Sequence, residues 1–109
     1  VKVVVNKDND ALYFSREPIP STKKWDGKAS MLKQVCIIPF RRDYLIRFNQ
    51  LGETPLEQIE SVDMMRVLEN GESVRMVFTE KESYSVDTQK DLEKVEKLML
   101  NDPLQEIYL

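Results

Sequence analysis

Two short runs of β-branched and aromatic residues open the chain, and they restrict its fold more than any other feature. Residues 1–5 read Val-Lys-Val-Val-Val and residues 11–15 read Ala-Leu-Tyr-Phe-Ser. Such residues favour extended backbone, and the polar residues between the runs, 6–10, are typical of a turn. We therefore predict a hairpin, which Pro18 and Pro20 end because proline cannot donate a ladder hydrogen bond.

Two later segments also have strand patterns. Residues 31–40 contain the uninterrupted apolar run Val35-Cys36-Ile37-Ile38, which predicts a buried strand. Residues 74–79 read Val-Arg-Met-Val-Phe-Thr, and the alternation at their start predicts a further strand.

Start and stop signals predict three helices. The first covers residues 44–51 and follows a capping Asp43. The second covers residues 54–70 and begins with Thr-Pro-Leu-Glu, which supplies an N-cap, a proline at the first helical position and the glutamate of a capping box. The third covers residues 88–100, is opened by an Asp-Thr pair, and repeats apolar residues at helical spacing.

The predicted element order is β-β-β-α-α-β-α, which indicates an α/β fold with strands of mixed direction. We assign residues 1–109 to a single domain, since that length suits one. Three helices are too few to cover both faces of such a sheet well. We therefore expect the chain to be one part of a larger protein. The alternative is a stand-alone α/β interaction module without catalysis.

Composition excludes several classes of protein. The chain has no histidine and one cysteine, Cys36, which rules out a disulfide framework, the usual zinc sites and any histidine triad within it. Its net charge of −3 makes nucleic acid and anionic membranes poor partners. The longest uncharged apolar run, residues 35–40, is too short to cross a bilayer. We therefore predict no membrane partner and a cytoplasmic location.

Three groups of polar residues are candidates for a functional site. Arg16 follows the second predicted strand, where its planar fork can bind a carboxylate or phosphate or can simply face water. Glu57, Glu60 and Asp63 recur every third residue and can accept hydrogen bonds from ligand hydroxyls or form a solvated helix face. Asp87 can cap the third helix or bind Mg²⁺. The residue pattern leaves each pair of alternatives open.

Four segments, taken in order, resemble one family of sugar-activating enzymes. They are residues 12–20 (LYFSREPIP), 33–41 (KQVCIIPFR), 54–61 (TPLEQIES) with 65–68 (MRVL), and 86–88 (VDT) with 91–92 (DL). Together they span nearly the whole chain. They resemble the C-terminal half of the 3-deoxy-manno-octulosonate cytidylyltransferases, also called CMP-KDO synthetases.

The resemblance implies an activity and an assembly. Members of that family transfer CMP from CTP to the sugar acid and release pyrophosphate, in the synthesis of surface lipopolysaccharide. The implied fold is a mixed, mostly parallel, Rossmann-like nucleotidyltransferase sheet with flanking helices. This chain would be its sugar-binding and dimerising half, without the N-terminal CTP-binding half, so that alone it would be inactive. The implied partners are CTP, a sugar acid and a second copy of the chain.

The resemblance also implies roles for individual residues, none of them catalytic. Arg16 would bind the carboxylate of the sugar acid, Glu60 would bind a sugar hydroxyl, and Asp87 would be one ligand of Mg²⁺. Gln34 stands where the family has histidine and can still bind a hydroxyl, whereas Ile38, in place of tyrosine, cannot. The sugar is therefore expected to be octulosonate, a modified form of it, or another 2-keto-3-deoxy acid.

Overall fold

The computed structural model describes residues 1–108 and divides into two units, residues 1–78 and the segment that starts at residue 79. The first unit contains three strands and three helices, and the second contains two helices. The elements of the first unit are β1 (Lys2–Val5), β2 (Ala11–Ser15), β3 (Leu32–Lys33), α1 (Arg42–Gln50), α2 (Pro55–Glu60) and α3 (Met65–Glu69). Those of the second are α4 (Gln89–Met99) and α5 (Gln105–Tyr108).

The predicted hairpin is confirmed. β1 pairs antiparallel with β2, placing Val3 opposite Phe14, and pairs antiparallel with β3 along its other edge. The sheet therefore has the order β2-β1-β3. The predicted mixed α/β class is confirmed as well, although the strands described within residues 1–108 all pair antiparallel.

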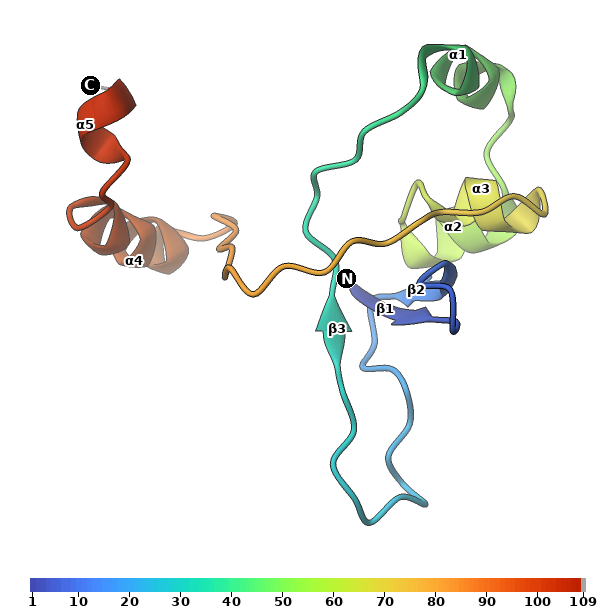
Figure 1. Cartoon of the computed structure of the whole chain (residues 1–109), viewed down its shortest axis with the longest axis horizontal. Helices are drawn as coiled ribbons and strands as arrows, with labels where there is room; N and C mark the ends of the chain where they lie inside the picture. The colour runs from blue at the N-terminus through green and yellow to red at the C-terminus, as the bar shows by residue number, and fades with distance from the viewer. Residues whose placement is uncertain (109) are drawn as a thin grey trace. The chain divides into compact units, whose positions relative to one another are not determined.

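The core of the first unit lies between the hairpin and the α2–α3 segment (Figure 1). Alternation along β2 turns Phe14 inward, and its side chain is completely buried. The buried apolar side chains come from β1, β2, α1, α3 and the segment between α2 and α3: Val3, Ala11, Phe14, Phe48, Val62, Met64, Met65 and Val67.

The predicted helix over residues 54–70 is wrong as one element, because it breaks at Ser61. Its start is confirmed, since the backbone N–H of Thr54 donates to Glu57 Oε2 at 3.2 Å and Pro55 occupies the first helical position. Ser61 then adopts a left-handed conformation with φ 54° and ends α2. Ile59, in the last turn of α2 before the break, is exposed.

A buried ion pair joins the two halves of this broken helix. Arg66 of α3 donates from Nε to Glu57 Oε2 at 2.8 Å and from Nη2 to Glu57 Oε1 at 2.5 Å. Its Nη1 donates to the carbonyls of Phe48 and Leu51 at the end of α1, and its guanidinium lies 4.4 Å from the centre of the Phe48 ring. One arginine therefore holds α1, α2 and α3 together.

The predicted strand over residues 31–40 is reduced to β3, and the predicted burial of residues 35–38 is wrong. The side chain of Ile37 is 82% exposed, and Cys36 and Ile38 are exposed too. Pairing with β1 reaches its limit where the Gln34 N–H donates to the Val1 carbonyl at 2.9 Å. Only Leu32 and Lys33 pair with β1 as a strand, so residues 36–38 are not part of the sheet.

The predicted strand over residues 74–79 is also wrong. The segment makes only an isolated bridge to the hairpin turn, through bonds from Ala11 N–H to the Val74 carbonyl and from Met76 N–H to the Asn9 carbonyl. Val77 and Phe78 beyond them are exposed. The turn is too short to pair with a full strand.

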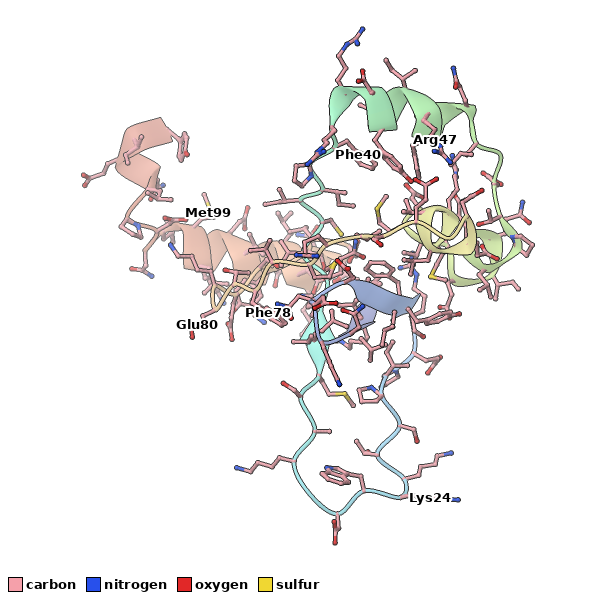
Figure 2. The ribbon with its side chains drawn as sticks, turned by 45° about the vertical axis from the view of Figure 1, so that its right-hand side comes forward. Lys24, Phe40, Arg47, Phe78, Glu80 and Met99 are labelled. Atoms are coloured by element: carbon pink, nitrogen blue, oxygen red, sulfur yellow. The ribbon has the colours of Figure 1, made fainter. Side chains whose placement is uncertain are left out.

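The predicted helix over residues 44–51 is confirmed with an earlier start. α1 begins at Arg42, after an N-cap at Arg41, so Asp43 lies in its first turn instead of capping it. Phe40 and Arg47 lie on the side of α1 that faces the rest of its unit (Figure 2). Phe40 packs against Phe48, with ring centres 5.5 Å apart, and Arg47 forms an ion pair with Glu72.

The second unit contains the predicted third helix and one that was not predicted. α4 covers nearly all of the expected residues and presents no buried side chain, and the short α5 follows Pro103. Within residues 1–108, no helix is long and apolar enough to cross a membrane.

Arg66→Met should destabilise the protein by about 3 kcal/mol, because the buried Glu57 carboxylate would lose its cation. The Arg66 guanidinium is the main reason why the pKa of Glu57 is lowered. A carboxyl group whose pKa is lower in the folded protein than in the unfolded chain stabilises the fold at pH values above its unfolded-state pKa. This stabilisation is lost as the pH falls through the folded-state pKa. The difference in the free energy of unfolding between variant and parent should therefore become smaller at acidic pH. Urea unfolding at neutral and acidic pH would measure it. Arg47→Met, at a more exposed pair, is the control, and an equal loss there would contradict the prediction.

Candidate binding site at the end of the sheet

The end of β2 meets the end of α2 through the side chain of Arg16. Its Nε donates to the Glu60 carbonyl at 2.9 Å, and its Nη2 donates to the Ser61 carbonyl at 2.6 Å. In a continuous helix these carbonyls would accept from the amides of residues 64 and 65, but the Met65 N–H donates to the Val62 carbonyl instead. Arg16 thus satisfies the carbonyls that the helix break leaves open.

The carboxylate of Glu60 is held on both of its oxygens. The Tyr13 hydroxyl donates to Oε1 at 2.9 Å, and the backbone N–H of Arg16 donates to Oε2 at 2.8 Å. The bond from the Arg16 N–H is the main cause of a lowered pKa at Glu60, to which Tyr13 and Ser15 contribute further hydrogen bonds. Glu60 is therefore an ionised acceptor of fixed orientation.

Only one edge of the planar Arg16 guanidinium group binds the carbonyls at the end of α2. A guanidinium has five N–H donors, and the bonds to α2 occupy the Nε–Nη2 edge. The Nη1–Nη2 edge points away from those carbonyls and matches the spacing of a carboxylate. The C-terminal end of α2 also carries partial negative charge, which stabilises the cation at this position.

Gln34 lies at the same end of the sheet as Arg16. Lys2 pairs with Ser15 on one side and with Lys33 on the other, so Val1 lies between Arg16 and Gln34 in the next row. Two strand spacings put the backbones of Arg16 and Gln34 about 10 Å apart. The structure thus brings Arg16 into contact with Glu60 and places Gln34 across β1 from Arg16.

Asp87 belongs to the second unit and does not cap α4. The N-cap is Thr88, whose Oγ1 accepts from the Asp91 N–H at 3.2 Å, while Asp91 Oδ2 accepts from the Thr88 N–H at 3.0 Å. The Asp87 side chain is exposed just before this cap. The described part of the chain contains no group of three or more His, Cys, Asp or Glu side chains that could hold a metal. Asp87 is therefore an exposed carboxylate that the described residues do not join to a metal-binding cluster.

The three carboxylates expected along one helix face do not share a face. Glu57 is buried against Arg66, Glu60 is bound by Tyr13 and Arg16, and Asp63 lies beyond the end of α2. The sequence interpretation overlooked Tyr13. Its signal was the alternation of β2, since Tyr13 and Ser15 share one face of the strand while Phe14 points to the core.

Comparison with known proteins shows the family. Residues 1–74 match the family model described as "Cytidylyltransferase", so the chain belongs to the cytidylyltransferase family. It is 45% identical to a 3-deoxy-manno-octulosonate cytidylyltransferase of Geobacter metallireducens, over 90% of this chain and 43% of that protein. It is 43% identical to the protein of the same name from Fusobacterium nucleatum, over 87% of this chain and 38% of that protein.

A solved structure agrees with these relatives. The structure of CMP:2-keto-3-deoxy-manno-octonic acid synthetase complexed with CTP superimposes with a TM-score of 0.82 at 44% identity, covering 91% of this chain and 41% of that one. The family resemblance inferred from the sequence, to the 3-deoxy-manno-octulosonate cytidylyltransferases, is therefore confirmed. The chain spans less than half the length of the relatives that it matches.

Thr88→Ala should cost about 1 kcal/mol of α4 stability, because the helix would lose its side-chain cap. Asp87→Ala should cost much less, because Asp87 precedes the cap. Circular dichroism during thermal unfolding would compare the two variants. Equal losses would show that Asp87 also serves as a cap.

Proposed function

We propose that the chain is the sugar-binding, C-terminal part of a cytidylyltransferase of the relatives' length. The complete protein would transfer CMP from CTP to 3-deoxy-manno-octulosonate or a related 2-keto-3-deoxy sugar acid and release pyrophosphate. The names of the relatives and the CTP-bound structure support this reaction. The observation that carries the assignment is the pairing of Arg16 with Glu60 at one end of the sheet.

This pairing suits a ligand that combines an acid group with hydroxyls. The free edge of the Arg16 fork offers two parallel donors to a carboxylate. Glu60 remains able to accept from a hydroxyl, because a carboxylate has about four acceptor positions. Gln34, one strand beyond Val1, adds an amide on the far side. Together these groups would bind the sugar acid by both of its chemical features.

The proposed reaction needs no histidine base. The anomeric hydroxyl of the sugar acid attacks the α-phosphorus of CTP, forming a new oxygen–phosphorus bond. The bond from the α-phosphorus to the bridging oxygen breaks, pyrophosphate leaves, and the hydroxyl proton passes to solvent. The residues of this chain hold the sugar so that its hydroxyl meets the phosphorus, and positioning of this kind supplies much of the rate.

Mg²⁺ is part of the proposal. The exposed Asp87 carboxylate would supply one of its ligands, and the bound ion would neutralise charge on the phosphates of CTP. The remaining protein ligands would come from outside residues 1–108, which contain no complete cluster.

The proposed setting follows from the same assignment. We propose that the complete protein acts in the cytoplasm as a homodimer, and that its product serves lipopolysaccharide synthesis. Leu98 and Met99 are exposed apolar side chains of α4, and Figure 2 labels Met99. We propose that such side chains are covered in the complete protein.

Arg16→Lys in the complete protein should raise the KM for the sugar acid at least tenfold, and more than the KM for CTP. Lysine keeps the charge but loses the planar fork, and it cannot bind the α2 carbonyls and a carboxylate in the same way. Steady-state pyrophosphate release at varied sugar acid and varied CTP would measure both constants. Arg47→Lys, on α1, is the matched control. Equal increases in both KM values would remove Arg16 from the sugar site.

Asp87→Asn in the complete protein should lower turnover by orders of magnitude and leave the melting temperature nearly unchanged. Asparagine keeps the shape of the side chain but removes the charge that Mg²⁺ binds. Calorimetric titration of the CTP-bound protein with Mg²⁺ would test the ligand role apart from turnover. Asp91→Asn is the comparison, and it should lower α4 stability more than Mg²⁺ affinity. Normal Mg²⁺ affinity in Asp87→Asn would contradict the proposal.

A further inference from the structure

The hydroxyl of Tyr13 lies behind the Arg16–Glu60 pair. It donates to Glu60 Oε1 at 2.9 Å, across 47 residues of sequence. The side chain is half-buried on β2, so its ring is fixed by the strand and the core beneath it. Oε2 of the same carboxylate is bound by the Arg16 N–H. Each oxygen of Glu60 is therefore fixed by a donor from the same strand end.

A glutamate side chain has several rotatable bonds, and a ligand that orders it must overcome the lost freedom. When protein groups hold the carboxylate beforehand, the ligand is spared that cost. The Arg16 N–H belongs to the backbone and cannot be changed by substitution. Tyr13 is the side chain whose removal would free Glu60 Oε1 without altering the charge at the site.

We propose that Tyr13 is a positioning residue for the sugar acid, because it holds the Glu60 carboxylate as a fixed acceptor beside the Arg16 fork. The inference rests on the proposed function. Tyr13 would contact Glu60, while Glu60 and Arg16 would contact the ligand. This role also gives β2 two tasks, since Phe14 forms the core while Tyr13 and Arg16 order the site.

The charges around Glu60 provide a direct measurement. The groups that act on it are the Arg16 N–H and guanidinium, the Tyr13 hydroxyl and the Ser15 hydroxyl. Glu69 of α3 is the other charged group that acts on Tyr13. The Tyr13 bond favours the ionised form of Glu60, so its loss should raise the pKa of Glu60 towards the ordinary range.

The test is Tyr13→Phe in the complete protein, which removes the hydroxyl and keeps the ring. We expect the KM for the sugar acid to rise about tenfold, while kcat and the KM for CTP change less than about twofold. Titration of the Glu60 carboxyl by NMR should show a higher pKa in the variant. The affinity of the variant for the sugar acid, divided by that of the parent, should then fall as the pH decreases. Titration of the sugar acid affects both proteins equally and therefore does not change this ratio.

Tyr44→Phe is the matched control, because it deletes a hydroxyl beside Glu72 in the same unit but away from the site. It should leave the pKa of Glu60 and the KM for the sugar acid unchanged. An unchanged Glu60 pKa in Tyr13→Phe would overturn the inference whatever the enzyme does. A raised Glu60 pKa with an unaltered KM for the sugar acid would also overturn it. A parent protein that binds no sugar acid would instead overturn the proposed function, and the positioning role with it.

Discussion

The buried pair of Glu57 and Arg66 is the interaction on which the rest of the first unit depends. A guanidinium and a carboxylate are costly to bury, and their attraction offsets that cost only when the remaining donors and acceptors are satisfied. Here they are, since Arg66 also donates to two carbonyls at the end of α1. Burial opposes charge on both partners, yet the pKa of Glu57 is lowered and that of Arg66 is raised, mainly because of the hydrogen bonds between them. The pair therefore fixes three short helices that are individually too short to be stable.

Both ends of α2 depend on side chains from elsewhere. At its start, the carboxylate of Glu69 accepts from the N–H groups of Leu56 and Glu57. At its end, the Arg16 guanidinium binds the carbonyls of Glu60 and Ser61. An acid at the N-terminus and a base at the C-terminus both complement the helix dipole. The same contacts that complete the helix place Glu60 and Arg16 beside each other, so the candidate site is a consequence of how α2 is terminated.

Local signals predicted the elements that depend on nearby residues. The hairpin and the start of α2 follow from strand propensity, turn residues and a capping box, all of which act over a few residues. The break at Ser61 could not be predicted in this way, because no glycine or proline marks it and the Ser61 carbonyl is bound by Arg16, 45 residues earlier. The exposure of residues 36–38 likewise could not be predicted, because their apolar pattern does not show that strand pairing covers only Leu32 and Lys33. An apolar run indicates that a segment tends to be buried. It does not indicate which other part of the protein buries it.

The candidate site was predicted in part for the same reason. Arg16 and Glu60 were identified by a family resemblance, but the contact between them joins two segments 44 residues apart. For Tyr13, the alternation of β2 indicates only which face of the strand it occupies, and a tyrosine in a strand is ordinary. The role proposed for it depends on the hydrogen bond from its hydroxyl to Glu60.

A fixed cation beside a fixed anion is selective in a way that neither group is alone. A neutral sugar would leave the free edge of the Arg16 fork without a partner, and losing a charge-assisted bond weakens binding. A simple anion without hydroxyls would approach the Glu60 carboxylate with nothing to donate, and like charges repel. A ligand with a carboxylate at one point and hydroxyls at another satisfies both groups. Under the proposed function, the contacts of Arg16 and Glu60 at the end of α2 would set the spacing between the two groups that a ligand has to match.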